Sequence, residues 1–310
     1  MEVTFESLTH LAITLWKFVA ADIRTLATPM LLVGVLSASS GNLLTTTPVP
    51  VTTILSNIPI TCFWILLNIL VISISNQRLP AGILEDKINK PWRPIASGRI
   101  GVEQASKLLL ASVVLLLGFG YYCNVLNETM GCLIANWVYN DLEGGDGNFV
   151  IRQVINGLAY LPCGIGSMKL IIGTGGLIMP NDRFYEWILA IALIVGTTTQ
   201  VQDLKDLDGD RARNRHTCPV ILGDFVTRFS CCAGIMFWSV WCFLYWDLKW
   251  QLCSPTMILG ATVILSISFL RGQKADKRSF LLWSFWVMSF LALPTLKMWQ
   301  QSESTALADF

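Results

Sequence analysis

Nine apolar segments separated by polar connections constrain the fold of this chain more than any other feature. A helix needs about 20 mostly apolar residues to cross a bilayer, with about 17 to 25 as the usual range. In lipid, backbone N–H and C=O groups must be paired within the segment, which favours helices. We therefore expect an all-α membrane protein with nine transmembrane helices. The segments are residues 23–39, 51–75, 106–122, 128–140, 152–174, 184–201, 226–246, 254–271 and 279–299.

The composition agrees with a membrane location. Hydrophobic residues make up 53% of the 310 residues and charged residues only 14%. A soluble domain carries about 25% charged residues, so this chain lacks the polar surface that a water-soluble globule needs. The formal net charge of +1 gives no reason to expect a nucleic-acid partner. The nine cysteines lack the spacings of zinc sites, and we expect neither bound zinc nor a disulfide framework.

The positions of Lys and Arg predict the orientation of the chain. Most of these residues lie in the connections after the second, sixth and eighth apolar segments. Because cytosolic connections carry the excess of positive charge, the N-terminus and the even-numbered connections are expected in the cytosol. The connection at 140–148 departs from this pattern, since it holds acids and no base. An internal membrane such as the endoplasmic reticulum is the expected location.

The connections after the second and sixth apolar segments share one order of charges, with acids followed by bases and then by Pro and Gly. Four apolar segments separate the two connections, and this repeat indicates an ancestral duplication of a helix bundle. Both connections lie on the expected cytosolic side. The first contains Glu85, Asp86, Lys90 and Arg93, and the second contains Asp203, Lys205, Asp206, Asp210, Arg211 and Arg213.

The acids of the second connection have helical spacing. Asp203, Asp206 and Asp210 follow one another at i, i+3 and i+7, so a helical continuation of the sixth segment places them on one face. Stacked like charges repel one another and are best explained by a bound cation. Mg²⁺ prefers oxygen ligands and shares phosphates with carboxylates. We predict that these three acids and Asp86 bind Mg²⁺, whereas Asp208 lies off this face and is expected to point outward.

Basic residues beside these acids would complete a phosphate-binding site. Lys and Arg bind phosphate oxygens while carboxylates hold the metal. Two alternatives stay open: the second connection can be a solvated charge-rich turn, and Asn76 can be a helix C-terminal residue. We interpret His216 as a structural hydrogen-bonding residue rather than a base. The predicted phosphate-binding residues are Asn76, Lys90, Arg93, Lys205 and Arg213.

Both connections contain sequence motifs that identify a family. The motifs read Asp86-x-x-Asn89-Lys90-Pro91-x-Arg93-Pro94 and Asp203-x-x-Asp206-x-x-Gly209-Asp210. They resemble the two motifs of the UbiA superfamily of intramembrane prenyltransferases and terpene cyclases, and the similarity extends over nearly the whole chain. The resemblance implies an all-α bundle around a central cavity, capped by two Asp-rich cytosolic loops that bind Mg²⁺ and an isoprenyl diphosphate. It also implies that Asp86, Asp206 and Asp210 are the catalytic residues.

The first motif departs from the pattern of the prenyltransferases. That pattern usually reads Asn-x-x-x-Asp-x-x-x-Asp, and when its last acid is aligned with Asp86, the middle acid falls on Gly82. The Asn position falls on Arg78, with Asn76 two residues earlier, so Asn76 is carried over only loosely. Gly or Ala in place of the middle acid is similar to the fungal UbiA-type terpene cyclases.

The resemblance implies an enzyme that ionises an isoprenyl diphosphate with Mg²⁺. The departure at Gly82 favours subsequent cyclisation to a terpene, and the alternative is transfer of the isoprenyl group to an aromatic or other small acceptor. A transporter is a remote alternative. The charges of an ion path would lie near the bilayer midplane, whereas the acids of this chain lie in connections at the ends of the apolar segments. We expect one domain over residues 1–310 and no obligatory protein partner.

Overall fold

The structure is a computed structural model that describes residues 5–308. Apart from one isolated bridge between Thr45 and Pro180, its regular secondary structure in that range is helical, which confirms the all-α prediction. The helical elements are α1 (Phe5–Val19), the π-helical η1 (Ile23–Ala27), α2 (Thr28–Ala38), the short η2 (Gly41–Leu43), α3 (Val51–Gln77), α4 (Pro80–Asn89), α5 (Val102–Tyr122), α6 (Leu126–Asn140), α7 (Phe149–Leu158), α8 (Tyr160–Ile172), α9 (Asp182–Thr198), α10 (Val201–Ala212), α11 (Cys218–Ile221), α12 (Gly223–Trp246), α13 (Trp250–Phe269), α14 (Gln273–Leu291) and α15 (Leu293–Ala308).

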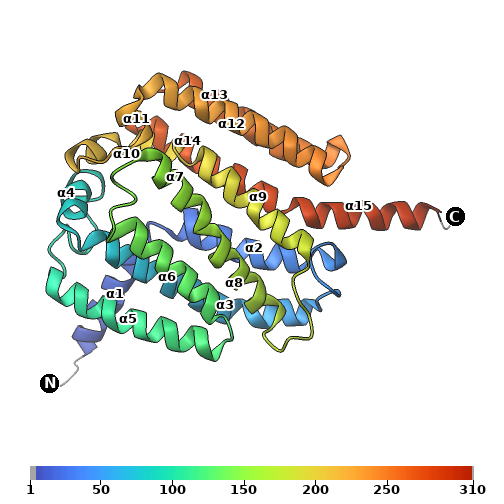
Figure 1. The fold of residues 1–310 in the computed structure, drawn as a ribbon, viewed down its shortest axis with the longest axis horizontal. Helices are drawn as coiled ribbons and strands as arrows, with labels where there is room; N and C mark the ends of the chain where they lie inside the picture. Colours follow the sequence, from blue (N-terminus) through green and yellow to red (C-terminus); the bar gives the residue numbers. More distant parts are fainter. Residues whose placement is uncertain (1–4, 309–310) are drawn as a thin grey trace.

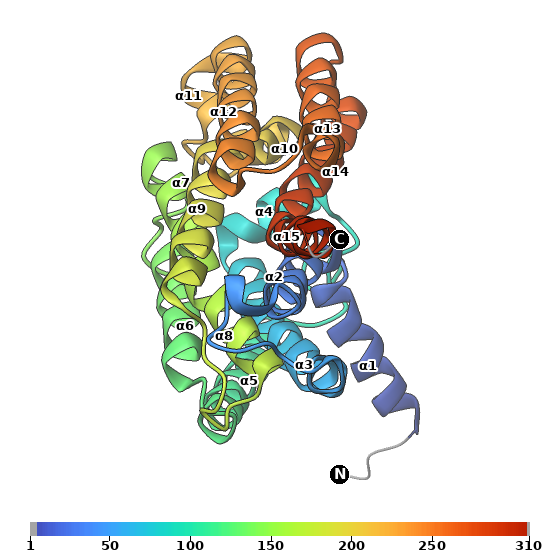
Figure 2. The same cartoon turned by 90° about the vertical axis from the view of Figure 1, so that its right-hand side faces the viewer.

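The long helices form a bundle, and the short helices α4, α10 and α11 gather at one end of it (Figure 1). The view turned by 90° shows α12 and α13 on the opposite side of the bundle from α1 and α5 (Figure 2). Large side chains such as Trp64 and Trp286 are fully buried between the helices, whereas Val114, Phe229 and Phe269 are exposed on α5, α12 and α13. An apolar outer surface of this kind suits contact with lipid.

Six stretches within residues 5–308 are long and apolar enough to cross a membrane, and the count rises to eight if each of two bent helix pairs is one span. The prediction of nine spans is therefore not confirmed. The fourth predicted segment forms α6, which has only 15 residues. The six stretches are Val51–Gln77, Val102–Tyr122, Phe149–Ile172, Gly223–Trp246, Trp250–Phe269 and Gln273–Thr305.

The acids of the two polar connections lie on helices, which corrects the expectation of Asp-rich loops. Pro80 starts α4, where its fixed φ angle and missing N–H suit the first helical turn. The helix α10 continues α9 after a bend of 47°, as the helical spacing of its acids predicted. At the bend, the hydroxyl groups of Thr197 and Thr198 donate to the carbonyl oxygens of Leu193 and Ile194, a pattern that bends helices.

A second bend lies just before the first predicted segment, and the segment predicted at 152–174 is divided in two. The chain bends by 55° between α1 and the stretch formed by η1 and α2. Pro29 follows the π-helical segment, and its lack of an N–H removes one ordinary helical hydrogen bond there. The segment predicted at 152–174 divides into α7 and α8 at Ala159, because Pro162 cannot donate to the carbonyl group of Leu158.

Small residues allow close contact between helices. Gly34 of α2 faces Ser167 of α8, and a β-carbon added at Gly34 would lie 2.6 Å from Ser167 Oγ and 2.8 Å from the Ser167 carbonyl oxygen. On α5, by contrast, Gly118 has no neighbouring atom within 4 Å of such a carbon. The two glycines therefore provide a matched pair for testing helix packing.

We predict that Gly34→Ala forces α2 and α8 apart and lowers the free energy of unfolding by about 1–3 kcal/mol, because the clash involves backbone. Thermal unfolding of the detergent-solubilised protein measures this loss as a lower Tm. The control Gly118→Ala should unfold at or above the wild-type temperature. Equal Tm values for the two variants would contradict the close contact of α2 with α8.

Candidate active site

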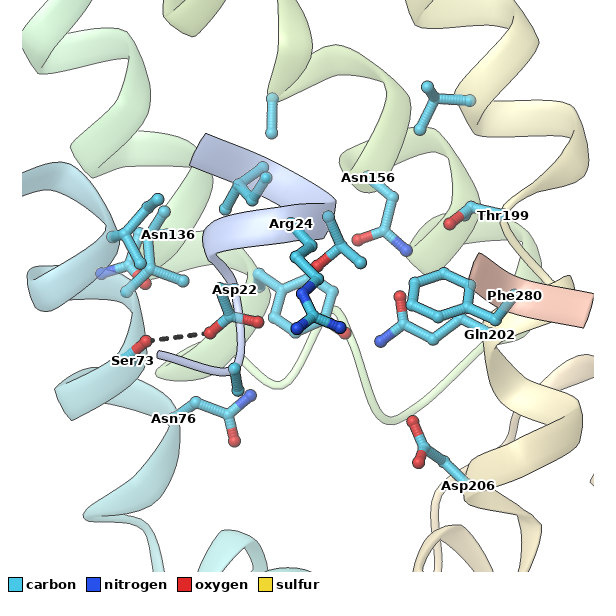
Figure 3. Close-up of a pocket in the computed structure, with 18 of the residues that line it drawn as sticks. Asp22, Arg24, Ser73, Asn76, Asn136, Asn156, Thr199, Gln202, Asp206 and Phe280 are labelled. Carbon is cyan, nitrogen blue, oxygen red and sulfur yellow. Dashed lines mark hydrogen bonds between the residues drawn. The ribbon is translucent and has the colours of Figure 1, made fainter. Parts of the chain in front are cut away.

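A cavity of about 610 Å³ lies inside the bundle, next to α4 and α10. Close to these helices its lining is polar, and Asn76 and Asp206 are arranged around the same space (Figure 3). Ile65 and Ile69 line the cavity further along α3, and Val195 lines it from α9. The cavity thus combines a charged mouth with a lining in which apolar side chains alternate with amides such as Asn68 and Asn156, and it has room for a molecule with a polar head and a hydrocarbon tail.

The two sequence motifs meet because α4 packs against α10. Asn89 Nδ2 donates to the backbone carbonyl oxygen of Asp206 at 3.2 Å. Gly209 faces Asn89 and Glu85, and any side chain at position 209 would collide with Asn89. The glycine of the second motif therefore permits the contact between the motifs.

The missing acid of the first motif also has a structural reason. Gly82 lies against the end of α3, and a β-carbon at this position would collide with the backbone carbonyl oxygen of Asn76. An aspartate at position 82 does not fit in this arrangement of α3 and α4. The middle carboxylate is thus both absent and sterically excluded.

In each motif, one buried acid pairs with a base of the same motif. Arg93 Nη1 lies 2.9 Å from Asp86 Oδ1 and 3.2 Å from Asp86 Oδ2. Lys205 donates to Asp206 Oδ2, and its ammonium group lies 4.9 Å from the ring centroid of Phe280. A buried charge without a partner is costly, so these pairs hold the mouth of the cavity together.

The other two acids of α10 pair with arginines that the sequence analysis did not select as site residues. Asp203 accepts from Arg152 at 2.9 Å and from Gln153 at 3.4 Å. Asp210 Oδ1 accepts from Arg215 at 3.2 Å. Arg152 lies in an apolar segment, where a charged side chain needs a partner. Its location in that segment was the one sequence signal that pointed to a buried ion pair.

Further contacts join α4 and α10 to the loop before α7. Arg213 donates to Asn76 Oδ1 at 3.2 Å, to Glu85 at 2.9 Å and to Asp146 at 2.9 Å. Arg215 lies 3.3 Å from Glu85 and 2.8 Å from Asp146. Asp146 belongs to the acidic connection at 140–148, so the unusual charge of that connection neutralises arginines that follow the second motif.

The pKa shifts of the two acids on α4 differ in direction. Burial by itself would raise the pKa of Glu85, but Arg215 and Lys90 outweigh it and hold that pKa below its ordinary value. Burial raises the pKa of Asp86, and Arg93 and Lys90 offset this only in part. Burial also lowers the pKa of Lys90. Asp86 is therefore a buried carboxylate whose charged form would gain from an additional cation nearby.

Within residues 5–308, no group of three or more His, Cys, Asp or Glu side chains is arranged to hold a metal ion. Two oxygen atoms at the contact of the motifs, Asp210 Oδ2 and Asn89 Oδ1, are buried without a hydrogen-bond partner. Carboxylate and amide oxygens of this kind suit Mg²⁺. The donor atoms therefore fit the metal, provided that acids such as Asp86 and Asp206 exchange their salt-bridge partners, and the ligand set stays a prediction.

Two further predictions agree with the structure. Asp208 is exposed on α10, away from the contact with α4. His216 Nδ1 lies 2.9 Å from the carbonyl oxygen of Gly147, which is a structural hydrogen bond. Lys90 lines the cavity, and its role in phosphate binding stays a prediction.

The sequence analysis missed the part of the cavity that comes from the break before α2. Asp22 and Arg24 lie at this break, and both line the cavity (Figure 3). The first apolar segment was expected to be one continuous helix starting at residue 23. A π-helical turn such as η1 often occurs at functional sites, but its sequence has no distinctive pattern.

Known proteins are similar to this chain in sequence. The model of the UbiA prenyltransferase family matches residues 27–291. The fumagillin beta-trans-bergamotene synthase of Aspergillus fumigatus is 30% identical over 240 residues, which cover 74% of this chain and 78% of the synthase. A polyprenyl transferase of Hericium erinaceus is 26% identical over 80% of this chain and 83% of the transferase.

The fold is also similar to that of a solved structure. A UbiA homologue from Archaeoglobus fulgidus, solved bound to GPP and Mg²⁺, matches 89% of this chain and 99% of that chain. Its TM-score is 0.55 at 14% sequence identity, so the likeness shows the fold. Together with the family match over most of the chain, these findings establish that this multi-pass membrane protein belongs to the UbiA prenyltransferase family.

Proposed function

We propose that this protein ionises an isoprenyl diphosphate with Mg²⁺ inside the membrane and converts the carbocation into a cyclic terpene. The observation that carries the proposal is the contact of two acid-and-base motifs at the mouth of an apolar cavity. Two similar proteins support it: the Aspergillus relative is named for a terpene product, and the Archaeoglobus homologue binds GPP and Mg²⁺.

The acids of the two motifs would hold the metal. Asp86 of α4 would act with Asp206 and Asp210 of α10, and Asp203 would join them if Arg152 released it. When bound, Mg²⁺ neutralises charge on the leaving diphosphate and so favours breakage of the allylic C–O bond. Each of these acids already pairs with a cation in the structure, so bound Mg²⁺ would take the place of an existing partner.

The bases of the motifs would bind the diphosphate oxygens. Arg93 and Lys205 pair with acids of the metal set, so a magnesium diphosphate would replace both partners at once. This exchange keeps every buried charge paired, and a lone buried charge would cost several kcal/mol. The residues proposed to contact the diphosphate are Asn76, Lys90, Arg93, Lys205 and Arg213.

The interior of the cavity protects the carbocation from water. Its apolar lining includes Ile65 and Ile69, and Tyr160, Phe280 and Trp283 contribute aromatic rings. The π faces of such rings stabilise positive charge. The hydrocarbon tail can therefore fold in a dry space, where its own double bonds capture the cation.

The alternative function is transfer of the isoprenyl group to an aromatic or other small acceptor. The amides of Asn156 and Gln202 lie beside the cavity and would orient a polar acceptor (Figure 3). The Hericium relative, named a polyprenyl transferase, also favours this alternative. We prefer cyclisation because Gly82 replaces the middle acid of the prenyltransferase motif. The transporter interpretation has no support from the family.

We further propose that residues 1–310 act as one domain, whose mouth faces the cytosol from an internal membrane and which needs no protein partner. Residues 1–4 and 309–310 lie outside the described range. The contacts that close the mouth join the halves of the chain, since Arg213 bonds to Asn76 and Glu85. This arrangement supports a single functional unit.

We predict that Asp210→Asn lowers diphosphate release from farnesyl or geranylgeranyl diphosphate by about a hundredfold or more, because charge stabilisation of the leaving group is lost. Release of inorganic diphosphate by the purified protein in Mg²⁺ measures this effect, and a chelator should abolish it. The control Asp208→Asn, on the exposed face of the same helix, should retain wild-type release. Full activity of the Asp210→Asn variant would refute the metal assignment.

We also predict that the protein makes a cyclic hydrocarbon from the isoprenyl diphosphate and Mg²⁺ alone. The apolar cavity supplies no second reactant, so the double bonds of the tail are the available nucleophiles. Extraction of the reaction and mass spectrometry identify the product. Turnover that appears only after an aromatic acceptor is added would establish prenyl transfer instead.

The ion pair of Arg152 with Asp203 allows a test of whether Asp203 has a structural role. We predict that Arg152→Gln lowers the free energy of unfolding by about 3–5 kcal/mol, because it leaves Asp203 buried and unpaired, and that adding Asp203→Asn recovers most of the loss. Thermal unfolding in detergent measures both variants. Lys107→Gln, which breaks the exposed pair with Glu103, is the control and should have little effect. No recovery in the double variant would argue against the pairing.

A further inference from the structure

Asp22 places a carboxylate inside the cavity by means of the helix break before α2. Its backbone angles, φ −106° and ψ 0°, lie in the sparsely populated region between helix and strand, where many active-site residues occur. The side chain points toward α3 and accepts a hydrogen bond from Ser73 Oγ at 3.2 Å (Figure 3). It is 30% exposed, and the exposed part lines the cavity.

The position of Ser73 gives the depth of Asp22 within the cavity. Ser73 precedes Asn76 by three residues on α3, which corresponds to about 4.5 Å along the helix axis. Ile69 and Ile65 follow on the same helix in the direction of the interior, and both line the cavity. Asp22 therefore lies at the boundary between the polar mouth and the space that would hold the hydrocarbon.

Three carboxylates line the cavity within the described part of the chain: Asp22, Glu85 and Asp206. Glu85 and Asp206 form close ion pairs, with Arg213 and Lys205 respectively. Asp22 has a longer ion pair, with Arg93 at 4.0 Å, and also interacts electrostatically with Lys90.

Arg93 makes its shorter contacts, at 2.9 and 3.2 Å, with Asp86. Asp22 is consequently the cavity carboxylate with the longest ion-pair contact. The oxygen atoms of a carboxylate without a close cation stay accessible to a substrate in the cavity.

We propose that Asp22 is the catalytic base that removes the proton ending the carbocation reaction. This inference rests on the proposed function. A C–H bond next to the cationic carbon breaks, its electron pair forms the new C=C bond, and the proton moves to an Asp22 carboxylate oxygen. The proton then leaves with water or diphosphate when the mouth opens for product release.

The same step serves both fates of the isoprenyl cation. In cyclisation the proton comes from the folded hydrocarbon, and in transfer to an aromatic ring it comes from the substituted ring carbon. Asp22 reaches Arg93 at 4.0 Å, whereas Arg93 keeps its contact of 2.9 Å with Asp86, so loss of the Asp22 charge should leave most of the ionisation step intact. The released diphosphate is the competing base, and the experiment below distinguishes the two.

The test compares diphosphate release with product composition for the wild type, Asp22→Asn, Asp22→Glu and the control Asp208→Asn, with farnesyl and geranylgeranyl diphosphate as probes. Asp22→Asn should release diphosphate at close to the wild-type rate. Its yield of deprotonated alkene should fall by about tenfold or more, as expected on loss of a general base, with alcohols from water capture in its place. Asp22→Glu should restore part of the alkene.

Ser73→Ala provides a second variant, because it removes the hydrogen bond that orients Asp22 without changing its charge. It should shift the ratio of alkene isomers while diphosphate release stays unchanged. An unaltered product spectrum in folded Asp22→Asn would overturn the inference and identify diphosphate as the base. Loss of diphosphate release in that variant would also overturn it, by assigning Asp22 to ionisation. Failure of the wild type to release diphosphate would instead overturn the proposed function.

Discussion

Charge pairing at the mouth of the cavity is the interaction on which the rest of this structure depends. The acids and bases of α4 and α10 are largely buried, and a buried charge without a partner costs several kcal/mol. Arg213 and Arg215 meet this need by joining both helices to the loop before α7. The result is a rim of alternating charges, in which a ligand that carries charges of both signs would keep every buried charge paired.

Helix breaks determine where this chemistry lies. The bend after α9 turns the acids of α10 toward α4, and the break before α2 brings Asp22 to the cavity. Irregular backbone at membrane depth is tolerated where it is buried in protein or lines a cavity. The helix breaks and the candidate site therefore lie together because both need the cavity. The cavity tolerates the irregular backbone, and it gives polar side chains access to partners or substrate.

The helix that carries the acids of the second motif was predictable because these residues are close in sequence. The spacing of Asp203, Asp206 and Asp210 predicted a helix, and α10 forms there, with Asp208 facing outward. The partners of these acids were not predictable in the same way. Arg152 contacts Asp203 across 51 positions, and a single sequence has no local pattern that pairs residues so far apart.

By itself, the sequence determined that the chain is a helical membrane protein with acids and bases concentrated after its second and sixth apolar segments. Apolar length and helical spacing are local properties, and they can be read without knowing how helices pack. Tertiary structure alone decided that the acidic connection at 140–148 neutralises Arg213 and Arg215, that position 82 has no room for an acid, and that Asp22 lines the cavity. These outcomes depend on where helices bend and how closely they approach, which many weak contacts between distant segments decide together.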